Sequence, residues 1–332
     1  MLKKTILATS LIAASLMGAE KINGAGATFP APLYYQWAYM YQAETKNQVN
    51  YQSIGSGGGI KQIQQRTVDF GASDKPLSPA ELKQSNLLQF PAVVGSIQIV
   101  YNLDGIGANQ LKLSNDVAAD IYLGKITMWN DPRIAKDNPG LALPAKRITV
   151  VHRSDGSGTT FNFVYWLSQI SKEWASKVGY GTSVNWPTGI GGKGNEGVTN
   201  IVKQTPGSIG YVEYAYVKQH NLKPAVLQSK EGTWVEASTA SIKAAAANAK
   251  WTKQDHFHEI LALQPGKNTY PIVAGTFILL PKEKPERNKK VVKFFNFAFD
   301  KGDAAAEKLG YIPLPTEAVS LIRSYFKDNG LQ

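Results

Sequence analysis

Short apolar runs alternate along this chain with segments in which apolar residues recur at the spacing of an amphipathic helix. Runs typical of buried strands lie at residues 49–54, 68–74, 90–101, 148–151, 208–213 and 270–280. Helical spacing of apolar residues is found at 33–42, 60–66, 117–123, 161–174, 196–204, 237–250, 289–300, 304–309 and 316–326. Because strands alternate with helices throughout, the pattern predicts an α/β fold built in layers.

The domain organisation follows from the length and from two long apolar strands. A chain of 332 residues corresponds to about two domains at ~150 residues each. We expect the strand at 90–101, interrupted by Gly95, to carry the chain into the second domain, and the strand at 270–280 to bring it back. The predicted division is residues 20–98 with 273–332 for domain I, and 99–272 for domain II.

The N-terminus has the layout of a secretory signal peptide, predicted at residues 1–19. Lys3 and Lys4 precede an apolar run of about 12 residues, and small residues follow it. That run is shorter than the ~20 residues that a membrane span needs. The chain has no cysteine, which excludes disulfides, thiolate metal sites and lipid attachment at an N-terminal cysteine. We therefore expect a soluble, exported protein that is not a lipoprotein.

The charge favours small anionic ligands over nucleic acid. The formal net charge is +11, yet the sequence has no run of five basic residues, so a nucleic-acid interface is not predicted.

His256 and His258 are the only clustered histidines, and their spacing of two is not that of a helical metal site. We interpret them as a solvated pair and expect neither a metal nor a cofactor.

A strand, a glycine-rich turn with a hydroxyl residue and a helix follow one another at three places. The turns contain Thr28, Ser56, and Ser157 with Thr159. The free N–H groups and positive end of each helix suit an oxyanion. Arg153 adds a guanidinium group beside the third turn. For Thr28 the alternative is a simple helix cap.

Asp74 is the one acid in this group of candidates. It ends a predicted strand, where α/β proteins hold their ligands, although it could also cap a turn. The set contains hydroxyl donors, a guanidinium and a carboxylate, without a base, a metal or an activated nucleophile. Ser56 and Ser157 lack the G-x-S-x-G elbow of many hydrolases. These residues therefore indicate binding rather than catalysis.

Residues 189–194 match the dinucleotide fingerprint G-x-G-x-x-G, but the segment before them, 185–188, is a poor strand. We interpret 189–194 as a flexible turn ahead of the next helix. A Walker A site is excluded because Lys193 is followed by glycine.

Five segments together resemble the periplasmic phosphate-binding proteins of phosphate-specific ABC transporters. They are GAGATFPAP (24–32), IGSGGG (54–59), VDFGASD (68–74), RSDGSGT (153–159) and SIGYVEY (208–214). The resemblance covers the whole chain after the signal peptide. It implies a two-domain periplasmic binding protein of type II, a venus flytrap with the ligand in the cleft between its domains.

The resemblance also implies a ligand set. The phosphate-binding residues would be Thr28, Phe29, Ser56, Asp74, Arg153, Ser157, Gly158 and Thr159, with Asp155 paired to Arg153 behind them. This chain departs from the family at Gly57, often a serine, and at His152, often a basic residue. We expect both departures to tune the cleft potential without changing the ligand.

The implied partners are inorganic phosphate, with arsenate as a competitor, and the membrane subunits and cytoplasmic ATPase of an ABC permease. A monomer is expected. Two alternatives are a receptor for another tetrahedral oxyanion, such as sulfate or molybdate, and a secreted phosphatase-like hydrolase. Asp74 argues against the first, because sulfate and molybdate bring no proton to a carboxylate.

Overall fold

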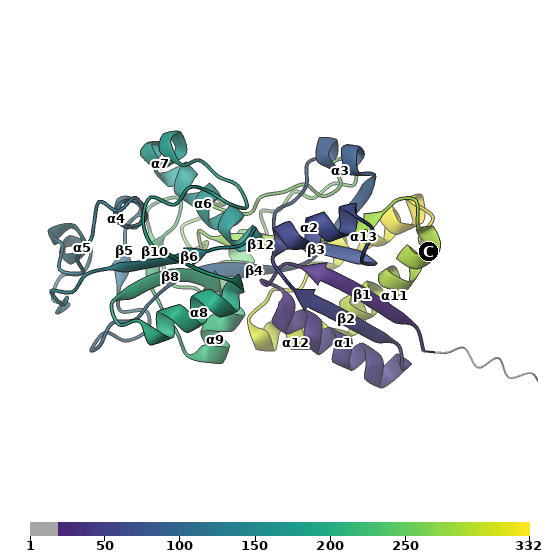
Figure 1. The fold of residues 1–332 in the computed structure, drawn as a ribbon, viewed down its shortest axis with the longest axis horizontal. Helices are drawn as coiled ribbons and strands as arrows, with labels where there is room; N and C mark the ends of the chain where they lie inside the picture. The colour runs from purple at the N-terminus through teal and green to yellow at the C-terminus, as the bar shows by residue number, and fades with distance from the viewer. Residues whose placement is uncertain (1–18) are drawn as a thin grey trace, which may run out of the picture.

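The computed structural model describes residues 19–332 as two α/β lobes that share a central sheet (Figure 1). The predicted signal peptide lies outside the described residues, apart from its last residue. Within the described part of the chain, no helix has the length and apolar character needed to cross a membrane.

The structure contains the following elements. The strands are β1 (Lys21–Gly26), β2 (Gln48–Ser53), β3 (Phe70–Ser73), β4 (Leu87–Tyr101), β5 (Lys112–Leu113), β6 (Thr149–Arg153), β7 (Ile190–Gly192), β8 (Ser208–Glu213), β9 (Lys223–Pro224), β10 (Val226–Gln228), β11 (Trp234–Val235) and β12 (Val273–Pro281). The helices are α1 (Ala31–Thr45), α2 (Ser56–Gln64), α3 (Pro79–Ser85), α4 (Asn115–Tyr122), α5 (Pro132–Asp137), α6 (Gly158–Ile170), α7 (Lys172–Lys177), α8 (Gly194–Gln204), α9 (Tyr214–His220), α10 (Thr239–Ala246), α11 (Pro285–Lys301), α12 (Asp303–Leu309) and α13 (Thr316–Asp328).

Strand β4 runs through both lobes. The main sheet has the order β2-β1-β3-β12-β4-β8-β6-β7. Along β4, residues 87–96 pair with β12, and residues 97–101 pair with β8. The change of partner lies close to the predicted first domain boundary. The exact division into 20–98 with 273–332 and 99–272 remains a prediction, and part of the segment assigned to domain II, at His256, contacts Tyr325 of domain I.

The parallel strands on each side of β4 determine where the predicted ligand site lies. β1 pairs in parallel with β2 and β3 in the first lobe, and β6 pairs in parallel with β7 and β8 in the second. Strands β3, β4, β8 and β12 are buried at every position, as expected for a sheet covered by helices on both faces. The carboxyl ends of the parallel strands, with the helices that follow, are the segments that meet between the lobes.

Gly95 does not interrupt β4, contrary to the sequence prediction. It pairs with Ala274 inside the ladder. A Cβ atom at this position would lie 2.7 Å from the Phe29 ring. The glycine therefore makes room for an aromatic side chain, and the strand continues past it.

Three predicted segments differ in detail from the observed ones. The segment 161–174 is two helices, because Ser171 has extended backbone angles and caps α7 by accepting a hydrogen bond from the Trp174 N–H. The loop-rich segment 127–144 contains α5, which the Asp131 side chain caps. The alanine-rich helix at 237–250 is shorter than predicted and begins after the Ser238 cap.

One hydrophobic cluster extends through both lobes. It includes Phe295 of α11 in the first lobe and Tyr211 of β8 in the second. Two smaller clusters lie beside it, one around Val198 and Val212 and one around Ile63 and Leu82. The lobes are therefore joined by a shared core as well as by shared strands.

Candidate functional site

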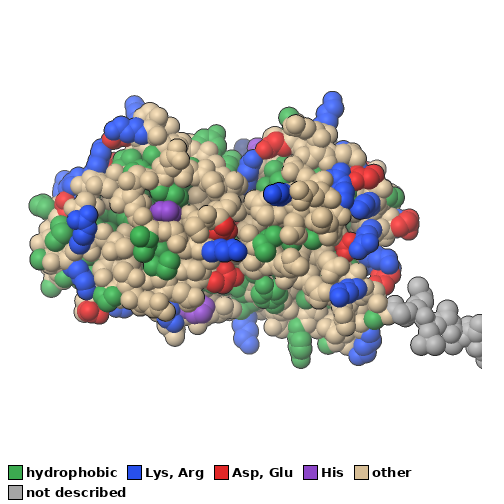
Figure 2. All heavy atoms as spheres, viewed as in Figure 1, with side chains coloured by type: hydrophobic (Ala, Val, Ile, Leu, Met, Phe, Trp, Pro, Cys, Tyr) green, Lys and Arg blue, Asp and Glu red, His purple; other side chains and the backbone are tan. Residues whose placement is uncertain are grey.

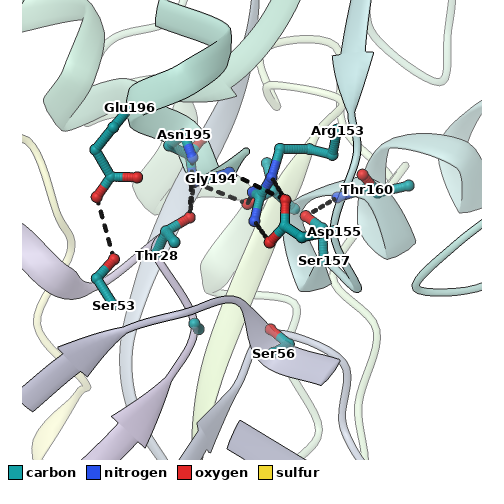
Figure 3. A network of polar contacts seen from close by, with 12 residues as sticks. Thr28, Ser53, Ser56, Arg153, Asp155, Ser157, Thr160, Gly194, Asn195 and Glu196 are labelled. Carbon is teal, nitrogen blue, oxygen red and sulfur yellow. Dashed lines mark hydrogen bonds and ion pairs between the residues drawn. The ribbon is translucent and has the colours of Figure 1, made fainter. Parts of the chain in front are cut away.

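Four helix N-termini meet between the lobes. Helices α1 and α2 follow β1 and β2 of the first lobe, and α6 and α8 follow β6 and β7 of the second. Contacts cross between the lobes here: the Gly57 N–H donates to the Gly156 carbonyl at 2.9 Å, and Asn162 Nδ2 donates to the Asp74 carbonyl at 2.7 Å. Figure 3 shows polar side chains from both lobes pointing toward one another.

The structure brings the predicted site residues together and buries them. The exposed fractions are 2% for Thr28, 0% for Phe29, 0% for Ser56, 1% for Asp74, 4% for Arg153, 0% for Ser157 and 0% for Thr159. Gly158 is buried as well. A ligand that binds among these groups is therefore shielded from solvent, and its exchange requires the lobes to separate.

Thr28 does not cap helix α1. The N-cap of α1 is Pro30, without a side-chain cap, and the Thr28 hydroxyl instead accepts hydrogen bonds from Asn195 in the other lobe. The simple helix-cap alternative is thus wrong. The neighbouring Phe29 buries its ring against Tyr311, whose hydroxyl donates to the Phe29 carbonyl at 2.6 Å. Phe29 therefore offers the site only its backbone N–H.

Ser56 and Asp74 form one polar pair in the first lobe. Ser56 begins α2, and its Oγ accepts from the Asp74 N–H at 3.1 Å and donates to Asp74 Oδ2 at 3.4 Å. The other carboxylate oxygen, Oδ1, is buried and has no hydrogen-bond partner among the described residues. Because ordinary buried polar atoms are paired, this oxygen is a free acceptor of the site; Glu213 Oε1, also buried at the junction, is another.

The protonation of Asp74 is set by its burial. Burial raises the pKa of Asp74 to about 7, and the Thr276 hydroxyl, the Arg153 charge and the Ser56 hydroxyl oppose that rise. Thr276 Oγ1 itself makes no bond of ordinary geometry within the described chain, so it acts as a nearby dipole. Near neutral pH, both the carboxylate and the carboxylic acid are therefore accessible states of Asp74.

Helix α6 directs free N–H groups toward this pair. Ser157 is its N-cap, and the Ser157 Oγ accepts from the Thr160 N–H at 2.9 Å. The N–H groups of Gly158 and Thr159, at the first two helical positions, have no intrahelical acceptor. A Cβ atom on Gly158 would lie 2.4 Å from Ser56 Oγ and 2.7 Å from Asp74 Cβ. Only glycine permits this close approach of α6 to the first lobe.

Arg153 forms a bidentate ion pair with Asp155. Its Nε donates to Asp155 Oδ1 at 2.7 Å, and its Nη2 donates to Oδ2 at 2.6 Å. Burial alone would raise the pKa of Asp155, but the hydrogen bonds and charge of Arg153 and the Gly194 N–H hold that pKa below its ordinary value. The pair fixes the guanidinium plane, and Nη1 remains directed at Thr159 Oγ1, 3.4 Å away.

The interpretation of residues 189–194 as a flexible turn is wrong. Residues Ile190–Gly192 form β7, which pairs in parallel with β6, and α8 starts directly afterwards. The Gly194 N–H donates to Asp155 Oδ1 at 3.0 Å, and Asn195 is fully buried against Thr28 and Thr159. The sequence signal was present, since this is a fourth strand, glycine turn and helix start.

The two departures from the family pattern have separate structural roles. A Cβ atom at Gly57 would lie 3.0 Å from Gly156 Cα, so the glycine lets the two backbones touch across the lobes. The His152 ring stacks on Trp186 at 4.7 Å between centroids. Burial lowers the pKa of His152, so at neutral pH it adds no positive charge beside Arg153. Their effect on the cleft potential remains a prediction.

No cluster of residues able to hold a metal ion occurs in the range 19–332.

On the face in Figure 2, basic and acidic side chains lie side by side at the junction of the lobes, with mostly uncharged surface around them. The interior of the junction thus combines backbone and hydroxyl donors, a guanidinium paired with a carboxylate, and the unpaired carboxylate oxygen of Asp74. That arrangement can hold a small oxyanion that carries a proton.

Comparisons with known proteins agree with this geometry. Residues 13–301 match the model of the PBP superfamily domain. The phosphate-binding protein PstS of Pasteurella multocida is 55% identical over 311 residues, which cover 93% of this chain and 90% of that protein. The phosphate-binding protein PstS of Haemophilus influenzae is 51% identical and covers 98% of each chain. The chain belongs to the PstS family.

Solved structures support the fold assigned to this PstS family member. The periplasmic phosphate-binding protein PfluDING has a TM-score of 0.73 at 22% identity, covering 92% of this chain and 93% of that one. A phosphate transporter substrate-binding protein from Clostridium perfringens has a TM-score of 0.66 at 19% identity, covering 89% and 100%. The predicted two-domain type II binding fold is confirmed.

Proposed function

We propose that this chain binds inorganic phosphate in the periplasm and delivers it to an ABC-type phosphate permease. The observation that carries the proposal is the unpaired acceptor Asp74 Oδ1, buried among hydrogen-bond donors from both lobes. Membership of the PstS family supports it, since the two relatives described above are named phosphate-binding proteins.

Phosphate is the oxyanion that this donor and acceptor set suits. Near neutral pH it carries at least one proton and can donate to Asp74, whereas fully ionised sulfate would face the carboxylate acceptor to acceptor. Arsenate is protonated in the same way and should compete. The same contrast disfavours molybdate, so a receptor for another tetrahedral oxyanion fits the site less well.

We assign the ligand contacts by position. The hydroxyls and backbone N–H groups at three helix starts donate to the ion, Arg153 supplies the positive charge, and Asp74 accepts the ligand proton. The proposed direct ligands are Thr28, Phe29, Ser56, Asp74, Arg153, Ser157, Gly158 and Thr159. Asp155 orients Arg153 through the bonds described above and does not itself contact the ion.

The proposed role in transport implies an oligomeric state, export from the cytoplasm and a set of membrane partners. The protein is proposed to act as a monomer, exported by its signal peptide, and to release phosphate to membrane subunits driven by a cytoplasmic ATPase. It binds its ligand without turnover, because none of the proposed contacts is a metal or an activated nucleophile.

Calorimetric titration of the purified protein with phosphate tests this proposal. At pH 9, where Asp74 is ionised, we expect saturation at one phosphate per chain, displacement by arsenate and no displacement by sulfate. Hydrolysis of a chromogenic phosphate ester by the same preparation would favour a phosphatase instead. Equal displacement by sulfate would favour a general oxyanion receptor.

Phosphate is also expected to close the two lobes. The contacts between Gly57 and Gly156 and between Asn162 and Asp74 join the lobes around the site, and binding proteins close by hinge motion around their ligands. Small-angle scattering should therefore give a smaller radius of gyration with phosphate than without it. An identical radius in both samples would contradict ligand-driven closure.

A further inference from the structure

Asn195, at the start of α8, links the hydroxyls of Thr28 and Thr159. It is fully buried. Its Nδ2 donates to Thr28 Oγ1 at 2.7 Å and to Thr159 Oγ1 at 3.1 Å, and its backbone N–H donates to the same Thr28 oxygen at 3.1 Å. One side chain therefore contacts two of the proposed phosphate ligands, one in each lobe; Figure 3 shows the contact between Asn195 and Thr28.

The hydrogen bonds to Thr28 leave its hydroxyl no capacity to accept another. A hydroxyl has two acceptor lone pairs and one proton. Both lone pairs of Thr28 Oγ1 are occupied by donors from Asn195. Within residues 19–332 no acceptor is bonded to the Thr28 proton, so the only bond that this hydroxyl can still form is one that it donates.

The Thr159 hydroxyl likewise has no capacity to accept a further hydrogen bond. Its oxygen accepts from Asn195 Nδ2 and, at 3.4 Å, from Arg153 Nη1. Its proton is likewise free of any acceptor in the described chain. Both threonines are thus set to donate, which is the role that an oxyanion requires of them.

The orientation of the Asn195 amide is fixed independently. Its Oδ1 accepts from the backbone N–H of Glu213 at 3.0 Å, and a backbone N–H can only donate. If the amide were turned over, two donors would face each other there. The amide therefore presents its NH₂ group to the two threonines.

We propose that Asn195 is a positioning residue that makes Thr28 and Thr159 donate, and never accept, at the ligand site. The inference rests on the proposed phosphate function. Because neither hydroxyl can accept the ligand proton, that proton is directed to Asp74. The bond to Thr28 crosses between the lobes, so this constraint is complete only when the lobes are closed.

A double-mutant cycle on phosphate affinity tests the proposal. We expect Asn195→Ala to weaken phosphate binding roughly tenfold to a hundredfold, the range of couplings within one hydrogen-bond network. In a Thr28→Val/Thr159→Val background the same change should cost less than about threefold, because no hydroxyl remains to be oriented. A merely structural role would give the same loss in both backgrounds.

Asn138→Ala is the matched control. Asn138 is also a buried asparagine, 6% exposed, and makes three side-chain hydrogen bonds with Lys112 and Ile134. Its removal should lower the melting temperature and leave phosphate affinity unchanged. If Asn195→Ala does not fold, Asn195→Leu, which keeps the branched shape and the number of side-chain heavy atoms, takes its place in the cycle.

The outcomes separate the two proposals. A wild-type protein that does not bind phosphate would contradict the proposed function, and this inference with it. A wild type that binds, with an Asn195→Ala variant within threefold of it or with equal losses in both backgrounds, would overturn the role of Asn195 alone.

Discussion

Replacing Asp74 with asparagine is expected to remove most of the discrimination between phosphate and sulfate. In the proposed site, the carboxylate would reject sulfate because its free oxygen would meet an anion that has no proton to give. An amide can donate as well as accept, so Asp74→Asn no longer opposes sulfate. Sites that require a ligand hydroxyl discriminate by roughly 10⁴ to 10⁵ against analogues without one. Because the pKa of Asp74 is about 7, the carboxylate outnumbers the acid by about 100 to 1 at pH 9, and we expect a loss of roughly 100-fold when the two anions are compared at that pH.

Calorimetric titration with both anions measures this change. Asp69→Asn is the control, because Asp69 is another buried aspartate of the same lobe, 4% exposed, but it pairs with Arg287 and the Asn23 N–H. It should leave the ratio of the two affinities unchanged. An Asp74→Asn protein that still excludes sulfate as strongly as the wild type would refute the role given to Asp74.

The same residue predicts a pH dependence. Since burial raises the pKa of Asp74 to about 7, lowering the pH protonates the carboxyl, which can then donate to sulfate. Wild-type affinity for sulfate should therefore rise about tenfold per pH unit on going from pH 9 toward 7 and level off below it. The Asp74→Asn protein should show no such slope.

Loss of the Arg153 guanidinium is expected to weaken phosphate binding by roughly 30-fold to several thousandfold, or about 2–5 kcal/mol. Arg153→Met removes the positive charge of the site. It also leaves the Asp155 carboxylate, 14% exposed, without its partner and close to the bound anion. Calorimetry with phosphate measures the loss, and a thermal melt checks that the variant is folded.

Removing both charges together should be less harmful than removing the cation alone. In Arg153→Met/Asp155→Asn no buried charge is left unpaired, so part of the affinity and stability should return. Asp155→Asn alone should have a modest effect, because Arg153 stays charged but less well oriented. Binding by Arg153→Met within threefold of the wild type would show that the guanidinium does not contact the ligand.

Much of this site could be predicted from local sequence. Ser56 and Ser157 each follow a predicted strand and a glycine turn, Thr28 follows a glycine turn, and Asp74 ends an apolar strand, so short-range patterns were enough to select them. The strand before Thr28, β1, was not among the predicted strands. Their common location between two lobes followed from the family resemblance. The structure brings these residues together, while their role as ligands remains a proposal.

The parts that were missed depend on tertiary contacts. Strand β7 is Ile-Gly-Gly and has no apolar pattern; its pairing with β6 makes it a strand, and without it the buried position of Asn195 is invisible. Gly95 seemed to break β4 because its neighbour, the Phe29 ring, is distant in sequence. The end of α6 at Ser171 was hidden because apolar spacing continues into α7.

Strand β4 gives the molecule a joint of an unusual kind. It is hydrogen-bonded to β12 on one side of the junction and to β8 on the other, so a paired strand, and not a flexible linker, joins the two lobes. Opening must bend a paired, twisted ribbon. The elastic stiffness of that ribbon then limits how far the lobes can separate, and the energy stored in bending it favours their return to the closed arrangement.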